Sequence, residues 1–129
     1  VLALEPQVLV LDEPTAGLDP QGRRALLHTL STWRAEDGRA TVLASHNMED
    51  VAELCDRVCV LVAGHIVLRG SPRKVFSHYD TLINSGLSVP VPTETILRLH
   101  RRGYQVPVLV LTAEEAAQAI EALVHVHRI

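Results

Sequence analysis

The chain of 129 residues is poor in aromatic residues, at 3%, and its formal net charge is -3. It therefore lacks the excess of lysine and arginine that nucleic-acid-binding domains carry. No apolar run approaches the roughly 18 residues that a membrane-spanning helix needs. No basic stretch followed by an apolar segment opens the chain, as a secretory signal would. These absences argue against a nucleic-acid partner, a transmembrane segment and secretion, whereas the 47% of hydrophobic residues can form a buried core.

The cysteine and histidine content gives little sign of a metal site or a disulfide. Cys55 and Cys59 have a spacing that would place both on one face of a helix, but Cys59 falls in an apolar run typical of a strand. We interpret both as small buried hydrophobic residues in a reducing compartment. His125 and His127 could bind a metal in an extended segment, but the sequence offers no third ligand beside them.

The first residues of the chain resemble the end of a structural element. The sequence starts at Val1, not at methionine, within the apolar stretch Val1–Leu4. We therefore expect a fragment of a longer protein.

Strand and helix patterns alternate in the first 78 residues. The apolar run Val8–Leu11 predicts a strand buried on both faces. Asp19 followed by Pro20 predicts the start of a helix over 20–34. With a second strand over 41–45, this order predicts a right-handed crossover between parallel strands. The other elements expected are a helix capped by Asn47, a hairpin of strands over 58–62 and 66–68, and a short helix over 72–77 capped by Ser71.

The rest of the chain has a weaker pattern. Residues 79–92 contain two prolines and a glycine and predict a linker. Thr93 is expected to cap a helix over 93–102, and a short strand interrupted by proline is expected over 106–111. The stretch Thr112–Glu115 fits a capping box that opens a final helix. The predicted fold is α/β, a parallel sheet with flanking helices, followed by a small α+β extension.

Two adjacent carboxylates follow the first strand. Ligands of open α/β sheets bind at the carboxyl ends of parallel strands, where Asp12 and Glu13 should lie. Because successive side chains on a strand point to opposite faces, the two acids should have different roles. Asp12 is suited to Mg²⁺, and Glu13 to orienting or deprotonating a water. The alternative is a solvated acidic turn without a catalytic role.

Asp19 and His46 are further candidates. Asp19 lies in the turn Ala16–Asp19, and a plain helix cap is the alternative to a functional role. His46 directly follows the second strand and should emerge at the same edge as the two carboxylates, where it could hydrogen-bond a phosphoryl group. Its alternative is an ordinary loop histidine.

In this order, the motifs resemble the ATP-binding subunit of ABC transporters, a family with a P-loop NTPase (RecA-like) sheet. The segments that carry the resemblance are Val8–Thr15 for the Walker B strand, Ala16–Pro20 for the D-loop, Ala44–Glu49 for the switch histidine, and Asp56–Val58 and Gly70–Pro72 for the closing stretch. Ala16 departs from the family, which often has serine there. The resemblance assigns residues 1–78 to the nucleotide-binding domain, 79–92 to a linker and 93–129 to an extension.

The resemblance implies a role for each candidate residue. ATP and Mg²⁺ would be the cofactors, with Asp12 holding Mg²⁺ and Glu13 acting as catalytic base. His46 would contact the γ-phosphate, and Asp19 would take part in nucleotide binding by communicating with a partner ATPase across the D-loop. The sequence lacks the G-x-x-x-x-G-K-[ST] loop, the glutamine loop and the signature motif. We therefore expect that these residues alone neither bind ATP tightly nor hydrolyse it, and that the missing strands leave an unpaired sheet edge.

The last part of the chain resembles the extension of energy-coupling factor ATPases, a group that includes importers of cobalt, nickel and vitamins. The segments concerned are Leu82–Pro90 and Thr112–Ala116. This resemblance implies a second ATPase subunit, a transmembrane coupling subunit, a substrate-binding membrane subunit and a place on the cytoplasmic face of the membrane. The extension would help to pair the ATPases, or would be a generic helical tail. Alternative functions are an ABC-type ATPase acting on ribosomes or DNA, and a non-catalytic, truncated remnant.

Overall fold

The computed structural model describes residues 6–36 and 38–126, and it begins with a strand–helix–strand unit. Strands β1 (Val8–Asp12) and β2 (Ala40–Ala44) pair in parallel and are joined by helix α1 (Pro20–Arg34). The parallel crossover expected from the sequence is confirmed. Val1–Leu4 and His127, which entered the sequence analysis, lie outside the described residues.

Helix α1 covers one face of this strand pair, and the other face is open. Leu27, Leu30 and Trp33 are the buried residues of α1, and Leu9 of β1 packs with two of them. Val10 on β1 is 71% exposed. The expectation that the first strand is buried on both faces is therefore wrong for this chain, because no described residue covers the second face.

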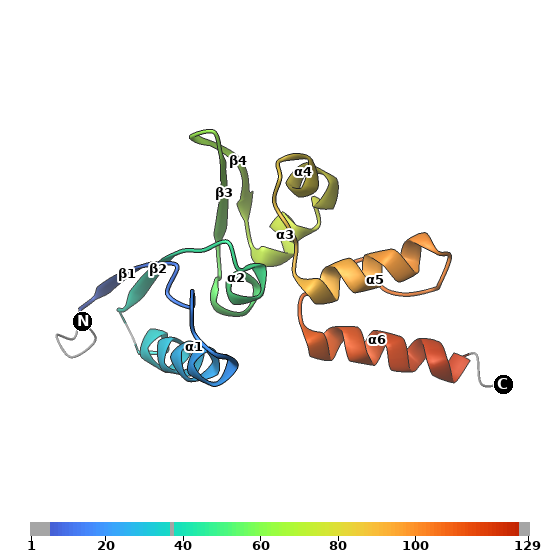
Figure 1. Cartoon of the computed structure of the whole chain (residues 1–129), viewed down its shortest axis with the longest axis horizontal. Helices are drawn as coiled ribbons and strands as arrows, with labels where there is room; N and C mark the ends of the chain where they lie inside the picture. Colours follow the sequence, from blue (N-terminus) through green and yellow to red (C-terminus); the bar gives the residue numbers. More distant parts are fainter. Residues whose placement is uncertain (1–5, 37, 127–129) are drawn as a thin grey trace.

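A second unit follows α1 and β2 in the chain. Helix α2 (Met48–Leu54) leads into strands β3 (Val58–Val62) and β4 (His65–Gly70), which form an antiparallel hairpin, and then into helix α3 (Pro72–Phe76). Figure 1 shows α2 at the base of this hairpin, close to α3. Among the described residues, the two strand pairs are not joined by hydrogen bonds. Within residues 6–36 and 38–126, β2 pairs with β1 and β3 pairs with β4, and neither has a second strand neighbour.

The largest core lies under the hairpin. Val75 and Phe76 of α3 and Leu82 are almost completely buried there, together with Val51 of α2 and Val60 of β3. Leu82 belongs to helix α4 (Tyr79–Asn84), within residues expected to form a linker. That expectation is wrong, because a buried leucine docks this short helix on the core.

The C-terminal extension consists of two packed helices, α5 (Val91–Arg101) and α6 (Ala113–Val126). Figure 1 shows them side by side, far from the parallel strands. Ile96 of α5 is buried against Ala116 and Ala119 of α6. The strand expected over 106–111 is not formed: these residues are irregular, and Pro107 has no amide hydrogen to donate to a strand partner.

The expected caps of these two helices differ in outcome. Thr93 does not cap α5, which begins two residues earlier; its hydroxyl is buried and donates to the carbonyl oxygen of Val110 at 2.5 Å. At the start of α6, Thr112 accepts from the Glu115 amide, as the capping box requires. The Glu115 carboxylate accepts instead from the Leu111 amide, at 2.8 Å. Within the described residues, no helix is long and apolar enough to cross a membrane.

Candidate functional site

The carboxyl ends of β1 and β2 bring Glu13 and His46 together. The Glu13 amide donates to the Ala44 carbonyl oxygen at 2.8 Å, so the strand pairing continues one residue past β1. His46 follows β2 after one intervening residue, Ser45. The parallel register therefore places the two candidate residues at one edge, as the sequence predicts.

A single oxygen of Glu13 holds His46 twice. Glu13 Oε1 accepts from the His46 amide at 2.9 Å and lies 2.7 Å from His46 Nδ1, while Ser45 Oγ is 3.5 Å from Oε2. The hydrogen bond from His46 lowers the pKa of the Glu13 carboxyl, against an opposing effect of burial. Glu13 is therefore ionised at neutral pH. Its φ of 44° is rare for a residue other than glycine and marks a sharp turn directly after the strand.

His46 and Asp12 remain open to further partners. The His46 side chain is 83% exposed, so its second ring nitrogen can contact a ligand. The Asp12 side chain is exposed at the end of β1 and forms no hydrogen bond or ion pair with a described residue. A free carboxylate oxygen suits Mg²⁺, which is usually held by one or two carboxylates plus phosphate oxygens. The residues present thus fit a magnesium nucleotide, although no cluster of three metal-binding side chains occurs in the described part of the chain.

Asp19 caps α1 and sits in an exposed loop. Its carboxylate accepts from the Gly22 amide at 2.7 Å, which satisfies a free amide of the first helical turn. The loop of residues 16–19 that precedes α1 is exposed, including the side chain of Leu18.

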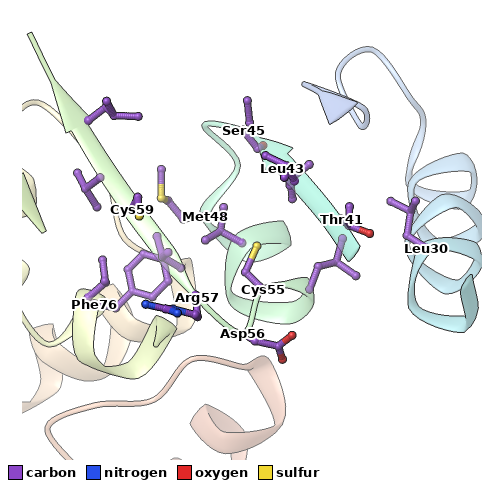
Figure 2. Close-up of a pocket in the computed structure, with 18 of the residues that line it drawn as sticks. Leu30, Thr41, Leu43, Ser45, Met48, Cys55, Asp56, Arg57, Cys59 and Phe76 are labelled. Atoms are coloured by element: carbon purple, nitrogen blue, oxygen red, sulfur yellow. The ribbon is translucent and has the colours of Figure 1, made fainter. Parts of the chain in front are cut away.

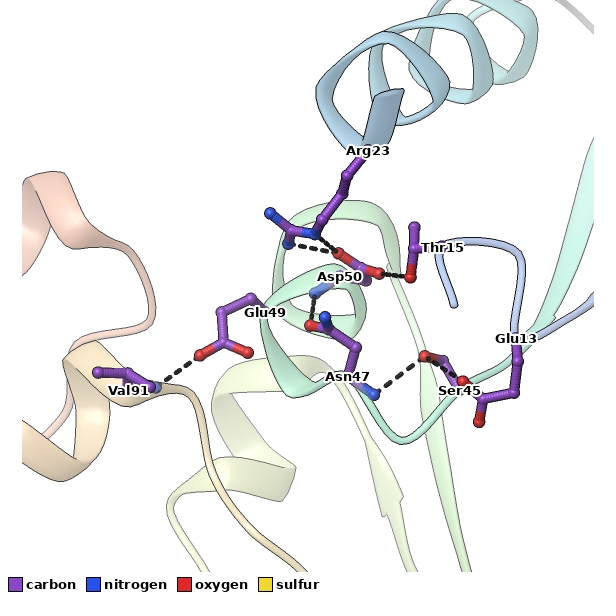
Figure 3. Close-up of polar contacts among 8 residues, drawn as sticks. All are labelled: Glu13, Thr15, Arg23, Ser45, Asn47, Glu49, Asp50 and Val91. Carbon is purple, nitrogen blue, oxygen red and sulfur yellow. Dashed lines mark hydrogen bonds and ion pairs between the residues drawn. The ribbon is translucent and has the colours of Figure 1, made fainter. Parts of the chain in front are cut away.

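Asp50 is a residue of this region that the sequence reasoning missed as a possible functional residue (Figure 3). Its side chain is 1% exposed, forms an ion pair with Arg23 of α1 and accepts from the Thr15 hydroxyl at 2.5 Å. Its amide donates to Asn47, the N-cap of α2. An acidic residue in the first turn of a helix is ordinarily explained by the helix dipole, so the sequence carries no signal of its burial.

A separate cleft lies between β2 and β3 and has a volume of about 770 Å³ (Figure 2). Its lining is largely apolar and includes Leu43, Met48 and Phe76. Cys55 and Cys59 also line it, and both are free thiols. Cys55 is partly buried, and burial raises its pKa. Cys59 is exposed, so the expectation that both are buried is wrong for Cys59, because no described strand covers that side of β3.

Comparisons with known proteins agree with the motif order. No family model matches the sequence. The energy-coupling factor transporter ATP-binding protein EcfA2 of Caldanaerobacter subterraneus is 44% identical over 120 residues, which cover 93% of this chain and 42% of that protein. The EcfA2 protein of Symbiobacterium thermophilum is 46% identical over 123 residues, covering 95% and 42%. The chain thus spans about two fifths of the length of the curated relatives it matches.

A solved structure supports the same assignment. It is cbiO1 from Clostridium perfringens, described as part of the ABC transporter complex cbiONQ. The match has a TM-score of 0.54 and 36% identity, and it covers 79% of this chain and 37% of that one. Together with the geometry at the strand ends, these comparisons show that the chain is similar to the ATP-binding subunits of ABC transporters, and in particular to those of energy-coupling factor transporters.

Proposed function

We propose that the full-length protein is the ATP-hydrolysing motor subunit of an ABC-type importer of the energy-coupling factor class, which takes up a metal ion or a vitamin. The observation that carries the proposal is the pairing of Glu13 and His46 at the carboxyl ends of two parallel strands. The names of the relatives, energy-coupling factor transporter ATP-binding proteins, support the transporter class.

Each residue at the strand ends has a role in this proposal. Bound Mg²⁺ would neutralise developing charge on the nucleotide phosphates, and Asp12 would hold it. Glu13, ionised at neutral pH, would orient and deprotonate the attacking water through its Oε2 atom, since Oε1 is engaged by His46. His46 would donate to the γ-phosphate from its exposed ring. Asp19 would take part in nucleotide binding by fixing the start of α1 and its exposed loop beside the partner ATPase.

The remaining machinery would come from elsewhere in the assembly. The phosphate-binding loop, with its backbone amides and lysine, would be supplied by other residues of the subunit. We infer that the subunit pairs with a second ATPase, docks on a transmembrane coupling subunit and a substrate-binding membrane subunit, and acts at the cytoplasmic face of the membrane. We also infer that residues 1–129 alone neither bind Mg-ATP tightly nor hydrolyse it. Titration calorimetry of this chain that gave micromolar affinity would overturn the latter inference.

The catalytic assignment is tested by Glu13→Gln in the full-length subunit assembled with its partners. Removing a general base should lower kcat by about 10²–10⁴-fold, with little change in the KM for ATP. The matched control is Glu53→Gln, because Glu53 is an exposed carboxylate on α2 away from the strand ends. Retention of more than half of the wild-type ATPase rate by Glu13→Gln would rule out the proposed role.

A further inference from the structure

The Asp50 carboxylate connects three segments that are distant in the sequence (Figure 3). One oxygen, Oδ1, accepts a hydrogen bond from Nε of Arg23 at 2.8 Å and a second one from Nη2 of the same guanidinium. The other oxygen, Oδ2, accepts a hydrogen bond from the Thr15 hydroxyl at 2.5 Å. Asp50 itself lies in the first turn of α2, just after the N-cap Asn47. A buried carboxylate is stable when both oxygens are paired, and here both are.

The two partners of Asp50 stand on either side of one exposed loop. Thr15 is buried just before the loop formed by residues 16–19. Arg23 lies just after the loop, in the first turns of α1. Between these anchors, Ala16 donates its amide to the Glu13 carbonyl oxygen, and Leu18 donates to that of Thr15. A loop whose two ends bind the same carboxylate cannot shift at one end without disturbing the other.

The Asp50 carboxylate is also connected to the strand ends that carry Glu13 and His46. Thr15 is two residues after Glu13, and Asp50 is four residues after His46 on a short, capped helix. The Asn47 amide also donates to Ser45 Oγ at 3.0 Å, which ties the start of α2 to the end of β2. The position of the exposed loop relative to Glu13 and His46 therefore depends on Asp50.

We propose that Asp50 is a positioning residue: through Thr15 and Arg23 it fixes the loop of residues 16–19 relative to Glu13 and His46. Its carboxylate bonds to Thr15 and Arg23, so it acts on Glu13 and His46 through other residues. The consequence for ATP hydrolysis rests on the proposed function, whereas the positioning itself does not. A displacement of about 1 Å at a catalytic constellation can reduce turnover by about 10²-fold, so loss of this anchor should lower kcat more than it changes the KM for ATP.

The positioning is tested by amide hydrogen exchange in the full-length subunit. Thr15→Val removes the hydroxyl but keeps the side-chain shape, and we expect the Ala16 and Leu18 amides to exchange at least about tenfold faster. Thr15→Ser should restore slow exchange because it keeps the hydroxyl. Amides within β1 should be unaffected, which separates local loosening from global unfolding. Unchanged exchange at Ala16 and Leu18 in Thr15→Val would overturn the proposal.

A second variant and a matched control complete the test. Asp50→Asn should loosen both ends of the loop, so the Arg23 amide should also exchange faster. Asp56→Asn is the control, because Asp56 forms an ion pair with Arg34 of the same helix α1 but is 82% exposed at the end remote from Glu13. It should leave exchange in the loop at the wild-type rate. If Asp56→Asn accelerated exchange at Ala16 and Leu18 as much as Asp50→Asn, the specific role of Asp50 would be refuted.

ATPase kinetics separate this proposal from the proposed function. Thr15→Val should lower kcat about tenfold or more and leave the KM for Mg-ATP within about twofold. If Glu13→Gln is inactive as expected but Thr15→Val turns over like the wild type, the positioning role in catalysis fails and the ATPase assignment stands. If Glu13→Gln keeps its activity, the ATPase assignment fails, and the exchange result still decides whether Asp50 holds the loop.

Discussion

Oε1 of Glu13 lies 2.7 Å from Nδ1 of His46 and 2.9 Å from the His46 backbone nitrogen. Glu13 follows β1 and His46 follows β2, so the contact connects the ends of two neighbouring parallel strands. One carboxylate oxygen accepts both bonds. The second oxygen has a more distant neighbour, Ser45 Oγ at 3.5 Å. His46 is thus held against Glu13, the residue that we propose as the catalytic base.

This contact predicts a specific change in the titration of Glu13. His46→Ala removes the ring, whose hydrogen bond is the largest cause of the lowered pKa, so the pKa of Glu13 should rise toward its ordinary value of 4.5. NMR titration of the side-chain carboxyl carbon measures it. His65→Ala is the control, because His65 is an exposed histidine of β4. Superimposable Glu13 titrations in the wild type and His46→Ala would contradict the assignment.

The direction of the pH effect on stability follows from the same contact. Because the pKa of Glu13 is lowered in the folded state, the contact contributes stability at pH values above 4.5, and the contribution is lost as the pH falls through the lower folded value. The free energy of unfolding in urea should therefore fall less between roughly pH 6 and pH 3 in His46→Ala than in the wild type. A carboxyl group titrates roughly between these two pH values. An equal fall in both proteins would exclude the contact as a source of pH-dependent stability.

The cap of α1 gives a second prediction. Asp19→Ala deletes the acceptor for the Gly22 amide and should lower the free energy of unfolding by about 0.5–2 kcal/mol, measured in urea. Asp19→Asn keeps a side-chain oxygen of equal capping strength and should be nearly neutral. Equal losses in the two variants would mean that the negative charge, not the capping bond, stabilises this turn.

The starts of α1, α2 and α3 were predicted from the sequence. Asp19, Asn47 and Ser71 were each expected to cap a helix, and each side chain accepts a hydrogen bond from an amide of the first turn. These signals depend on residues three positions apart, so they can be read without knowing the rest of the fold. The pairing of Glu13 with His46 was also predictable, because parallel strands end at a common edge.

Features that depend on distant residues were not predictable. Asp50 is buried because Arg23 and Thr15 reach it from another helix and a loop, and nothing in its own neighbourhood signals them. The helix α4 has no side-chain cap and forms because Leu82 docks on a core built by earlier elements. Thr93 has the sequence context of a cap, yet its hydroxyl donates to the carbonyl oxygen of Val110, 17 residues later in the chain.

The two thiols should differ in reactivity in the 129-residue chain. The thiolate is the reactive form, and burial raises the pKa of Cys55, whereas Cys59 is exposed. Limited alkylation with iodoacetamide followed by mass spectrometry should therefore modify Cys59 first. Cys59→Ser should abolish the fast phase, and Cys55→Ser should keep it. A fast phase that survives in Cys59→Ser would show that Cys55 is accessible.

The buried hydroxyl of Thr93 should stabilise the C-terminal extension. Thr93→Val keeps the shape of the side chain but leaves the Val110 carbonyl oxygen without its donor, so the free energy of unfolding should fall by about 1–3 kcal/mol. Thr93→Ser should retain most of the stability because it keeps the hydroxyl. Thr95→Val is the matched control, since Thr95 is exposed on the same helix and bonds within it; it should change stability by less than about 0.5 kcal/mol. If both valine variants were equally stable, the hydrogen bond from Thr93 to Val110 would contribute nothing to the free energy of unfolding. The packing of Ile96 against α6 would then stabilise the extension without it.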